Sequence, residues 1–434
     1  MQCGFAMLCA GSVRAKNVKN IMLKNLLDAC GGALGFWSIG YAVAYGTGGK
    51  FIGASGDEFF LNNYSGGSNH IGFFFQFTFA ATAATIVAGT VAERCKMEAY
   101  LLYSVFLTAF VYPVVVHAIW NSDGFLCAFS GDPMGGIGMI DFAGSGVVHM
   151  TGGCTALVAA IVLGPRVGRF YDEEGKALAE PHSFAPHSVS LQVLGTFILW
   201  FGWYGFNPGS TLSISPNGYG DVAALCAVNT TLSAATGAIT AMFFDTLLSM
   251  CTEGLAEYDI TMAMNGALGG LVGITANCSV VEPWAAVMIG MFSGLVYVGA
   301  SKLLVKLKID DAVDAVPVHF FCGMWGCIAT GIFASPKIVS STYGTDGGGF
   351  LYGEWTLLGV ELLGILFIVG WTAGIMTPFF LIINHLGLFR VDPTEERVGL
   401  DISHHKGAAY DMTGADAKAV EQMLEERASK HVSA

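Results

Sequence analysis

Charged side chains are scarce in this sequence: only 12% of its 434 residues are Asp, Glu, Lys or Arg. Soluble globular proteins usually carry about 25%. The chain is also 53% apolar, with a mean hydropathy of +0.59. This composition excludes an ordinary soluble domain and predicts an all-α polytopic membrane protein.

The sequence also lacks the patterns that build disulfide frameworks and metal sites. Its 11 cysteines are scattered, without a repeated short spacing and without a Cys/His cluster of metal-binding type. We therefore expect no metal and no cofactor. The net charge is −13 and there is no basic patch, so nucleic acid is not an expected partner.

What the sequence has instead is glycine and long apolar runs. It contains 58 glycines, and in lipid such small residues let helices pack closely. A run of about 20 apolar residues is long enough to cross a bilayer. Ten runs are predicted to cross: 26–46, 71–92, 99–119, 142–164, 188–207, 222–249, 260–278, 283–304, 315–334 and 355–385.

A shorter run, MQCGFAMLCAG, stands at the start of the sequence. We interpret it as the inner half of a further crossing whose outer half is missing from this sequence, which brings the predicted number of transmembrane helices to eleven. The transmembrane domain would then be residues 1–385. Residues 386–434 are predicted to form a cytosolic tail, with a short surface helix from about Asp416 to Lys430.

The basic residues predict the orientation, because lysine and arginine concentrate in cytoplasmic loops. Only Lys50 and Lys337 fall on the other face. We therefore expect an extracellular N-terminus and a cytoplasmic C-terminus in a multi-pass plasma-membrane protein. The positively charged face comprises Arg14, Lys16, Lys19, Lys24, Arg94, Lys96, Arg166, Arg169, Lys176, Lys302, Lys306, Lys308 and six residues of the tail.

One predicted crossing contains a histidine. The stretch DFAGSGVVHMTGGCTALVAAIVLG runs from Asp141 to Gly164 and has no formal charge after its first residue. His149 is thus an imidazole at membrane depth. Ionisable groups there are costly unless they face a cavity or a partner, so His149 is a candidate functional residue.

A second crossing repeats this design. His319 follows Asp311 by eight positions, as His149 follows Asp141. Many transporters consist of two related halves with the conduction site between them. The sequence therefore predicts two pseudo-symmetric five-helix halves whose histidines face each other on a pore axis. Further matched pairs are Val148 with Val318, Gly153 with Gly323, and Ala159 with Ala329.

Five motifs, in order and spacing, resemble the ammonium transporter family, and most closely its plant and algal type. They are FVYPVVVHAIW, DFAGSGVVH, FGWYGFNPGS, NGALGGLVGITANC and DDAVDAVPVH, and the resemblance extends from QCGFAMLCAGSVRAKN to GLDISHHKGAAY. The resemblance implies a homotrimeric transporter or channel, not an enzyme, that serves nitrogen uptake. Its partners would be the lipid bilayer and ammonium or ammonia, with methylammonium as a candidate second substrate.

In that family two hydrogen-bonded histidines line a narrow hydrophobic pore, and the matching residues are His149 and His319. Ammonium resembles a lysine ammonium group in acidity, with a pKa of about 10. A dry pore disfavours the charged form. The ammonia that results needs a partner that both donates and accepts hydrogen bonds, as imidazole does. The alternative is a pair of packed core histidines.

The resemblance also assigns an aromatic site and a gate. Cation to ring attraction contributes ~1 to 2 kcal/mol when partly desolvated, which suits recruitment of a cation without trapping it. A gate of apolar rings would exclude hydrated potassium and sodium. The matching residues are Phe75, Phe79, Trp120 and Ser210 for recruitment, Phe79 and Phe206 for the gate, and Trp203 for a further lining ring.

Asp141 is required near the recruitment site in the family. At the start of a helix a carboxylate can cap free amides, and direct contact with the cation is the alternative. Asp310, Asp311 and Asp314 open the tenth crossing, where we expect simple capping.

Ser403 matches a hydroxyl residue that is phosphorylated in plant-type relatives. A phosphate there could undock the tail and close all pores of the trimer. The sequence departs from those relatives here, because they more often carry Thr followed by Arg-His-Gly-Gly and this sequence has Ser-His-His-Lys. An unmodified turn residue is the alternative.

Two other functions remain open from the sequence. The first is an ammonium sensor or receptor of the same fold with little conduction. The second is a membrane oxidoreductase with His149 and His319 as haem ligands, although only two histidines lie deep in apolar segments.

Overall fold

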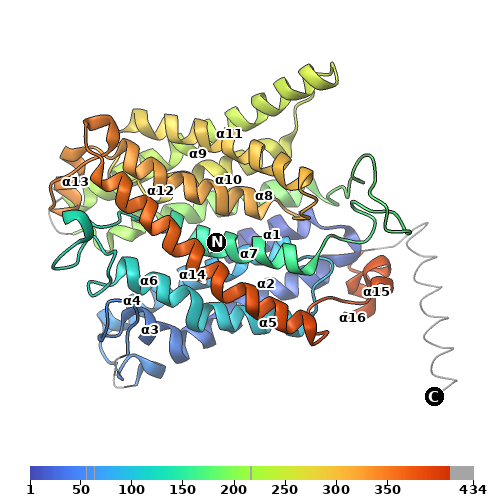
Figure 1. Cartoon of the computed structure of the whole chain (residues 1–434), viewed down its shortest axis with the longest axis horizontal. Helices are drawn as coiled ribbons and strands as arrows, with labels where there is room; N and C mark the ends of the chain where they lie inside the picture. The colour runs from blue at the N-terminus through green and yellow to red at the C-terminus, as the bar shows by residue number, and fades with distance from the viewer. Residues whose placement is uncertain (55, 63, 216–217, 411–434) are drawn as a thin grey trace.

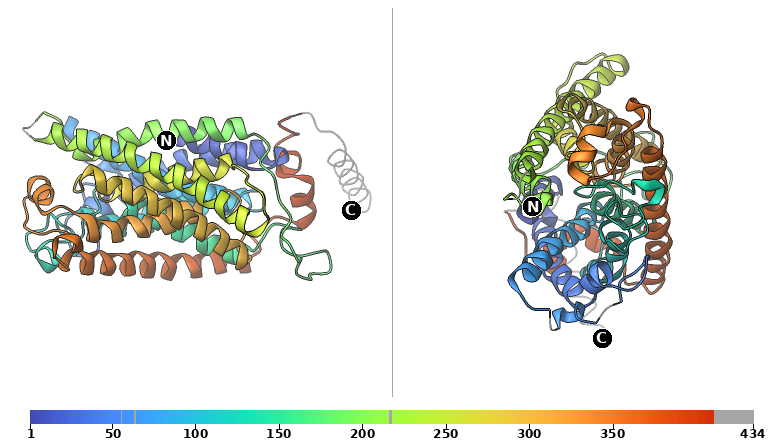
Figure 2. Two further views of the ribbon diagram at one scale, coloured as in Figure 1. Left: turned by 90° about the horizontal axis from the view of Figure 1, so that it is seen from above. Right: turned by 90° about the vertical axis from the view of Figure 1, so that its left-hand side faces the viewer.

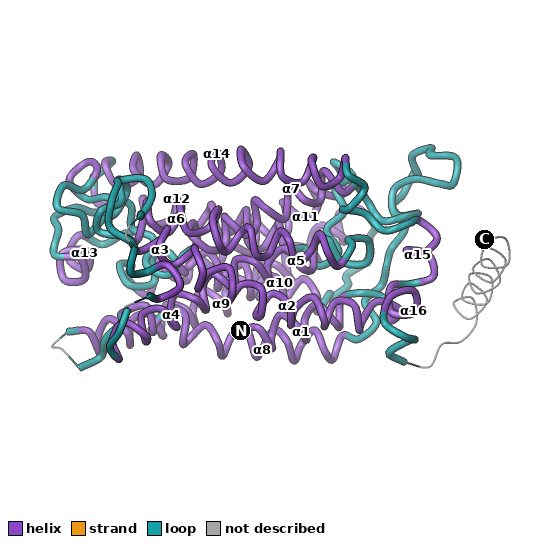
Figure 3. The backbone as a smooth tube through the Cα atoms, turned by 90° about the horizontal axis from the view of Figure 1, so that it is seen from below, coloured by secondary structure: helices purple, strands orange, loops and turns teal. Residues whose placement is uncertain are grey.

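The computed structural model describes residues 1–54, 56–62, 64–215 and 218–410. Within these ranges the chain is helical and forms no β-strand, only four isolated bridges. The helices run side by side along the long axis of the molecule, and the loops gather at its two ends (Figures 1, 2 and 3). The all-α prediction is therefore confirmed for the described residues.

The helices have these bounds: α1 Gln2–Ser12, α2 Val18–Gly35, α3 Tyr41–Tyr45, α4 Gly67–Thr90, α5 Met97–Phe106, α6 Tyr112–Trp120, α7 Thr151–Leu163, α8 Val189–Phe206, α9 Tyr219–Thr252, α10 Ile260–Thr275, α11 Pro283–Lys306, α12 Cys322–Phe333, α13 Pro336–Tyr343, α14 Thr356–His385, α15 Pro393–Val398 and α16 Leu400–His404.

Four segments are π-helical: η2 Phe36–Gly40 joins α2 to α3, η4 Leu107–Val111 joins α5 to α6, and η6 Ser145–Met150 and η8 Val316–Phe321 open the helices that continue as α7 and α12. Segments of this kind occur frequently at functional sites. Each of the last two contains one of the predicted histidines, His149 in η6 and His319 in η8.

Nine helical stretches in the described part of the chain are long and apolar enough to cross a membrane. They confirm several membrane-spanning helices. Two predicted crossings coincide with shorter helices, α1 with 11 residues and α10 with 16. The count of eleven crossings and the division into two halves stay predictions.

The bundle has apolar side chains on its outside as well as in its core. Phe201 on α8 is 80% exposed, Ile71 on α4 is 71% exposed and Leu366 on α14 is 68% exposed. Exposed apolar surface on this scale marks contact with a membrane or with other subunits. This surface agrees with a bundle that lies in a bilayer.

The second crossing begins earlier than predicted, at Val18 rather than residue 26. The prediction was wrong because it began the crossing only after the basic residues Lys19 and Lys24. In the structure these residues belong to the helix, and other segments supply their partners. The carboxylate of Asp401 accepts hydrogen bonds from the backbone nitrogens of Lys19, at 3.0 Å, and Asn20, at 2.9 Å. Lys24 is fully buried and donates to the carbonyl of Cys95 at 2.7 Å.

The contacts of Asp401 show how the first part of the predicted tail docks on the bundle. Helices α15 and α16 lie at one end of the bundle (Figure 3), and α16 packs on the start of α2. The helix predicted from Asp416 to Lys430 lies outside the described residues.

Candidate functional site

The two histidines meet inside the bundle. His149 Nδ1 lies 3.1 Å from His319 Nδ1, and the ring planes are inclined by 13°. His149 is fully buried and His319 is 5% exposed. A hydrogen bond of this kind needs a hydrogen on one Nδ1 and a lone pair on the other. One imidazole therefore donates to the other, and each keeps its Nε2 for a different partner.

Two glycines set the approach of the helices that carry these histidines. A β-carbon on Gly153 would lie 2.5 Å from the backbone nitrogen of Phe320, which follows His319. A β-carbon on Gly323 would lie 2.6 Å from the carbonyl oxygen of Ser145 in η6. Real β-carbons do not come this close to backbone atoms. The reciprocal glycines thus allow η6 and η8 to touch.

A series of rings leads away from the histidine pair. His149 stacks on Trp203 with 5.3 Å between centroids, and its ring lies 5.7 Å from that of Phe206. The ring centroids of Phe206 and Phe79 lie 4.2 Å apart. Phe79 meets Trp120 edge-on, with 5.7 Å between the ring centroids. The sequence-predicted rings therefore form one continuous row from Trp120 to the histidines.

Two hydrogen bonds orient the tryptophans of this row. Trp203 Nε1 donates to Thr275 Oγ1 at 2.9 Å, and Trp120 Nε1 donates to the carbonyl of Asp141 at 2.7 Å. Buried tryptophans usually need such a partner. Thr275 was not predicted, and no pattern in the sequence distinguishes it from other helix threonines.

A pocket of about 540 Å³ lies at one end of the row, which we call the Trp120 pocket. Its Ser210 hydroxyl donates to the carbonyl of Phe206 at 2.8 Å, which leaves the oxygen lone pairs free to accept. The pocket therefore combines ring faces with an acceptor oxygen. The predicted residues that line it are Phe75, Phe79, Trp120, Asp141 and Ser210.

Asp141 uses its carboxylate as a helix cap. Oδ1 accepts from the backbone nitrogen of Gly144 at 3.1 Å, and Oδ2 accepts from those of Gly146 at 2.9 Å and Val147 at 2.8 Å. These amides open η6, where a carboxylate is favoured. Asp141 thus holds the start of the segment that carries His149.

A much smaller cavity of about 20 Å³ lies at the other end of the row, which we call the His319 cavity. A cavity needs about 10 to 15 Å³ of such volume to hold one water molecule. The His319 cavity can therefore hold one molecule of that size. Its walls include Phe5, Cys9, Thr85, Asn265 and His319.

Phe5 is a residue that the sequence interpretation missed. It comes from α1, and its ring lies 6.0 Å from that of His319. The initial apolar run was interpreted only as half of a crossing, and one phenylalanine among 31 gives no separate signal. Helix α1 packs along α8 and also contacts α4, which forms another part of the wall of the His319 cavity.

Ser403 lies apart from this row. It belongs to α16, and its hydroxyl donates to the carbonyl of Gly399 at 3.0 Å. It lines neither the Trp120 pocket nor the His319 cavity. Any influence of Ser403 on the row would have to pass through the contacts of α16 with α2.

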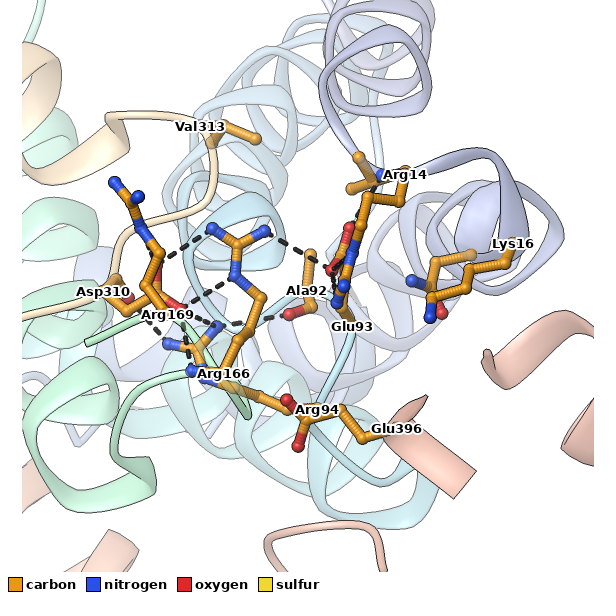
Figure 4. A network of polar contacts seen from close by, with 12 residues as sticks. Arg14, Lys16, Ala92, Glu93, Arg94, Arg166, Arg169, Asp310, Val313 and Glu396 are labelled. Atoms are coloured by element: carbon orange, nitrogen blue, oxygen red, sulfur yellow. Dashed lines mark hydrogen bonds and ion pairs between the residues drawn. The ribbon is translucent and has the colours of Figure 1, made fainter. Parts of the chain in front are cut away.

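A cluster of buried charges lies at the end of the bundle near α15 and α16 (Figure 4). Arg166 binds Asp310 with two hydrogen bonds, from Nε to Oδ2 at 2.8 Å and from Nη2 to Oδ1 at 2.9 Å. Asp310 was expected to cap the tenth crossing, which was wrong. Its carboxylate pairs with arginines, whereas Asp311 caps Val316 at 2.7 Å.

The same cluster holds Glu93, which pairs with Arg14 at 2.5 Å and with Arg166 at 3.4 Å. Burial alone would raise the pKa of Glu93, but the two guanidinium groups outweigh it and lower that pKa to about 2. The pKa of Asp310 is likewise held well below its usual range, because Arg94 and Arg166 outweigh its burial. The cluster joins the end of α4 to the loops that follow α7 and precede η8.

The described residues contain no group of three or more His, Cys, Asp or Glu that could hold a metal ion.

A sequence model of the Ammonium Transporter Family matches residues 1–410. The chain belongs to the ammonium transporter family. It is therefore a multi-pass membrane protein of a transporter family and not an enzyme, and the oxidoreductase alternative is wrong.

Two relatives of this ammonium transporter family member come from plants. The chain is 47% identical over 417 residues to putative ammonium transporter 1 member 5 of Arabidopsis thaliana, covering 93% of this chain and 82% of the relative. It is 44% identical over 434 residues to ammonium transporter 1 member 3 of Solanum lycopersicum, covering 96% of this chain and 92% of the relative.

Solved structures share its fold. A structure described as a sensor Amt protein is 34% identical, with a TM-score of 0.79, and the match covers 93% of this chain and 94% of that one. The crystal structure of Candida albicans Mep2 is 28% identical, with a TM-score of 0.78, covering 90% of this chain and 83% of that one. The predicted family is confirmed.

Proposed function

We propose that this chain carries ammonium inward across a plasma membrane, as a homotrimer with an extracellular N-terminus and a cytoplasmic C-terminus. In this proposal eleven helices cross the membrane, in two related halves. The observation that supports it most is the row of rings between the Trp120 pocket and the His319 cavity. This row joins the Trp120 pocket, which we propose as the recruitment site, to a buried hydrogen-bonding pair.

Recruitment would take place in the Trp120 pocket. The faces of Phe75, Phe79 and Trp120 attract a cation, and the Ser210 oxygen can accept a hydrogen bond from ammonium. Asp141 would act by position, because its oxygens already accept three backbone amides. Its negative charge nearby still favours a cation in the pocket.

Deprotonation would follow at the gate. Phe79 and Phe206, 4.2 Å apart, leave no room for a hydrated ion. Ammonium can enter the dry region beyond them as neutral ammonia, because low dielectric disfavours its charged form. Potassium and sodium have no proton to lose, so the same rings exclude them.

Passage would then use the histidine pair. The ring nitrogens that do not join His149 to His319 can exchange hydrogen bonds with ammonia in single file. His149 Nε2 has no hydrogen-bond partner in the described residues. A buried polar atom without a partner favours a passing molecule that supplies one.

Regulation would involve Ser403 in α16. A phosphate there would stand two residues from Asp401, whose carboxylate binds the start of α2. Added negative charge would repel that carboxylate and weaken the docking. We propose that undocking α16 lowers transport.

A sensor is the second candidate function, since a structure described as a sensor Amt protein is 34% identical with a TM-score of 0.79. Labelled methylammonium uptake in cells without their own ammonium transporters separates the two functions. Saturable uptake that ammonium competes away supports the transporter. No uptake from wild-type protein that surface labelling finds in the membrane favours the sensor.

A further inference from the structure

A buried carboxyl group on α2 has no place in the proposed route of ammonia. Asp28 is fully buried, ten residues or about 15 Å along the helix from Val18. It lines neither the Trp120 pocket nor the His319 cavity. An ionisable residue within a membrane helix is a candidate functional site by default, because its burial is costly.

One oxygen of this carboxyl group is occupied and the other is not. The hydroxyl of Tyr100, on α5, donates to Asp28 Oδ2. Oδ1 is buried and has no hydrogen-bond partner in the described residues. The side chains of Ser104 and Thr85 face the same carboxyl group, and the Ser104 hydroxyl also lacks a partner. A buried oxygen in this state gains from binding a hydrogen.

Thr85 connects this oxygen to the candidate pore. Its side chain belongs to the wall of the His319 cavity and also faces Asp28. Its hydroxyl is held by the amide of Gln2, with Nε2 to Oγ1 at 2.9 Å. The cavity where ammonia would leave His319 is thus separated from Asp28 by one hydroxyl-bearing side chain.

Lys24 lies one helical turn from Asp28, toward the end of the bundle that carries α15 and α16. It is fully buried, and its ammonium group donates to the carbonyl of Cys95 at 2.7 Å. Its charge offsets that of an ionised Asp28 within the same helix. The other titratable groups that face Asp28 are Tyr100 and Tyr103 on α5 and Cys9 on α1.

We propose that Asp28 is a proton-binding site beside the ammonia route, which takes up the proton that ammonium loses and releases it toward the Lys24 end of α2. This inference rests on the proposed transport function. The step is balanced: ammonium loses its proton at the gate and continues as ammonia, while a proton passed through the hydrogen bond between His149 and His319 and the Thr85 hydroxyl converts the Asp28 carboxylate into a neutral carboxylic acid, with the new O–H bond at Oδ1. The carboxylic acid then returns its proton to water at the α15 and α16 end, so each transported molecule carries one charge across.

The test measures membrane current and labelled methylammonium uptake in the same cells, which gives the charge carried per molecule. We expect one charge per molecule for the wild type and a loss of that charge, with uptake retained, for Asp28→Asn. Asp245→Asn is the matched control, because Asp245 lies in α9, pairs with Lys302 at 2.9 Å and lines neither cavity. It should keep the wild-type ratio.

Thr85→Val removes only the hydroxyl between the cavity and Asp28, and it should also lower the charge carried per molecule. This variant replaces Asp28→Asn in the test if Asp28→Asn does not reach the membrane. Infrared difference spectra of wild-type protein with isotope-labelled aspartate give a measurement without substitution. Ammonium should produce a carboxylic acid carbonyl band there.

Three results overturn the inference: a wild-type ratio in Asp28→Asn or in a correctly inserted Thr85→Val, uptake without charge in the wild type, or no such band. If the wild type and Asp28→Asn both take up methylammonium with one charge per molecule, the inference about Asp28 is overturned and the proposed transport function is not. No uptake by inserted wild-type protein overturns the proposed function as well.

Discussion

Gly153 lies against the backbone of Phe320, the residue that follows His319, so closely that a β-carbon would stand 2.5 Å from the Phe320 nitrogen. Gly323 lies in the same way against Ser145. The distance between the imidazoles is thus set by two backbone contacts rather than by the histidine side chains alone. This relationship makes the glycines as important to the proposed route as the histidines.

Gly153→Ala should therefore separate the histidines. A methyl group forced against backbone costs ~1 to 3 kcal/mol and shifts the helices. We expect most methylammonium uptake to be lost in inserted protein, with a lower melting temperature. Gly370→Ala in α14 is the control, because nothing lies within 4 Å of its β-position. Equal uptake by both variants contradicts the account.

Phe206→Ala should open the gate. The Phe206 and Phe79 rings lie 4.2 Å apart, and without one of them hydrated cations can enter. We expect a potassium current that the wild type lacks, measured by voltage clamp without ammonium. Phe201→Ala changes a ring on the same helix that is 80% exposed and should carry no such current. If Phe206→Ala carries no potassium current, the gate lies elsewhere.

Acid should weaken the charge cluster around Glu93. The pKa of Glu93 is about 2 in the folded protein against an ordinary value of 4.5, because Arg166 and Arg14 outweigh the effect of burial. A lowered pKa stabilises the fold above pH 4.5, and this stabilisation is lost as the pH falls from about 4.5 to about 2. The melting temperature of purified wild-type protein should therefore fall across this window.

Glu93→Gln is the comparison for that titration. It cannot ionise, so its melting temperature should be lower near pH 6 and should fall less on acidification. Parallel curves for the two proteins would mean that Glu93 does not contribute this pH dependence.

Ser403→Asp should lower uptake, because it places negative charge near Asp401 where α16 meets α2. Ser403→Ala loses only the hydrogen bond to the Gly399 carbonyl and should transport as the wild type does. Uptake kinetics at equal surface expression give the comparison. Unchanged uptake by Ser403→Asp argues against regulation at this position.

The sequence predicted most of the helices because apolar length is a strong signal. It placed α2 eight residues too late, because burial of Lys24 depends on the Cys95 carbonyl and the Asp401 cap, which come from distant segments. Asp310 was misassigned for the same reason, since Arg166 reaches it across 144 positions.

Within the candidate site, the family resemblance supplied every ring of the row, and the repeat around Asp141 and Asp311 pointed to the histidines. Phe5, Thr85 and Asp28 could not be found this way. Their role depends on how α1 and α4 line the His319 cavity and how α2 packs on α4, and no spacing along the chain records that packing.

The histidine pair is the centre of this account. The most direct measurement is labelled methylammonium uptake together with potassium current for a His149→Ala, His319→Ala double variant. The matched control is His70→Ala with His182→Ala, two exposed histidines outside both cavities. We predict that the first variant loses ammonium-competed uptake or becomes permeable to potassium, while the control matches the wild type. Normal, selective uptake by the inserted double variant would contradict the account.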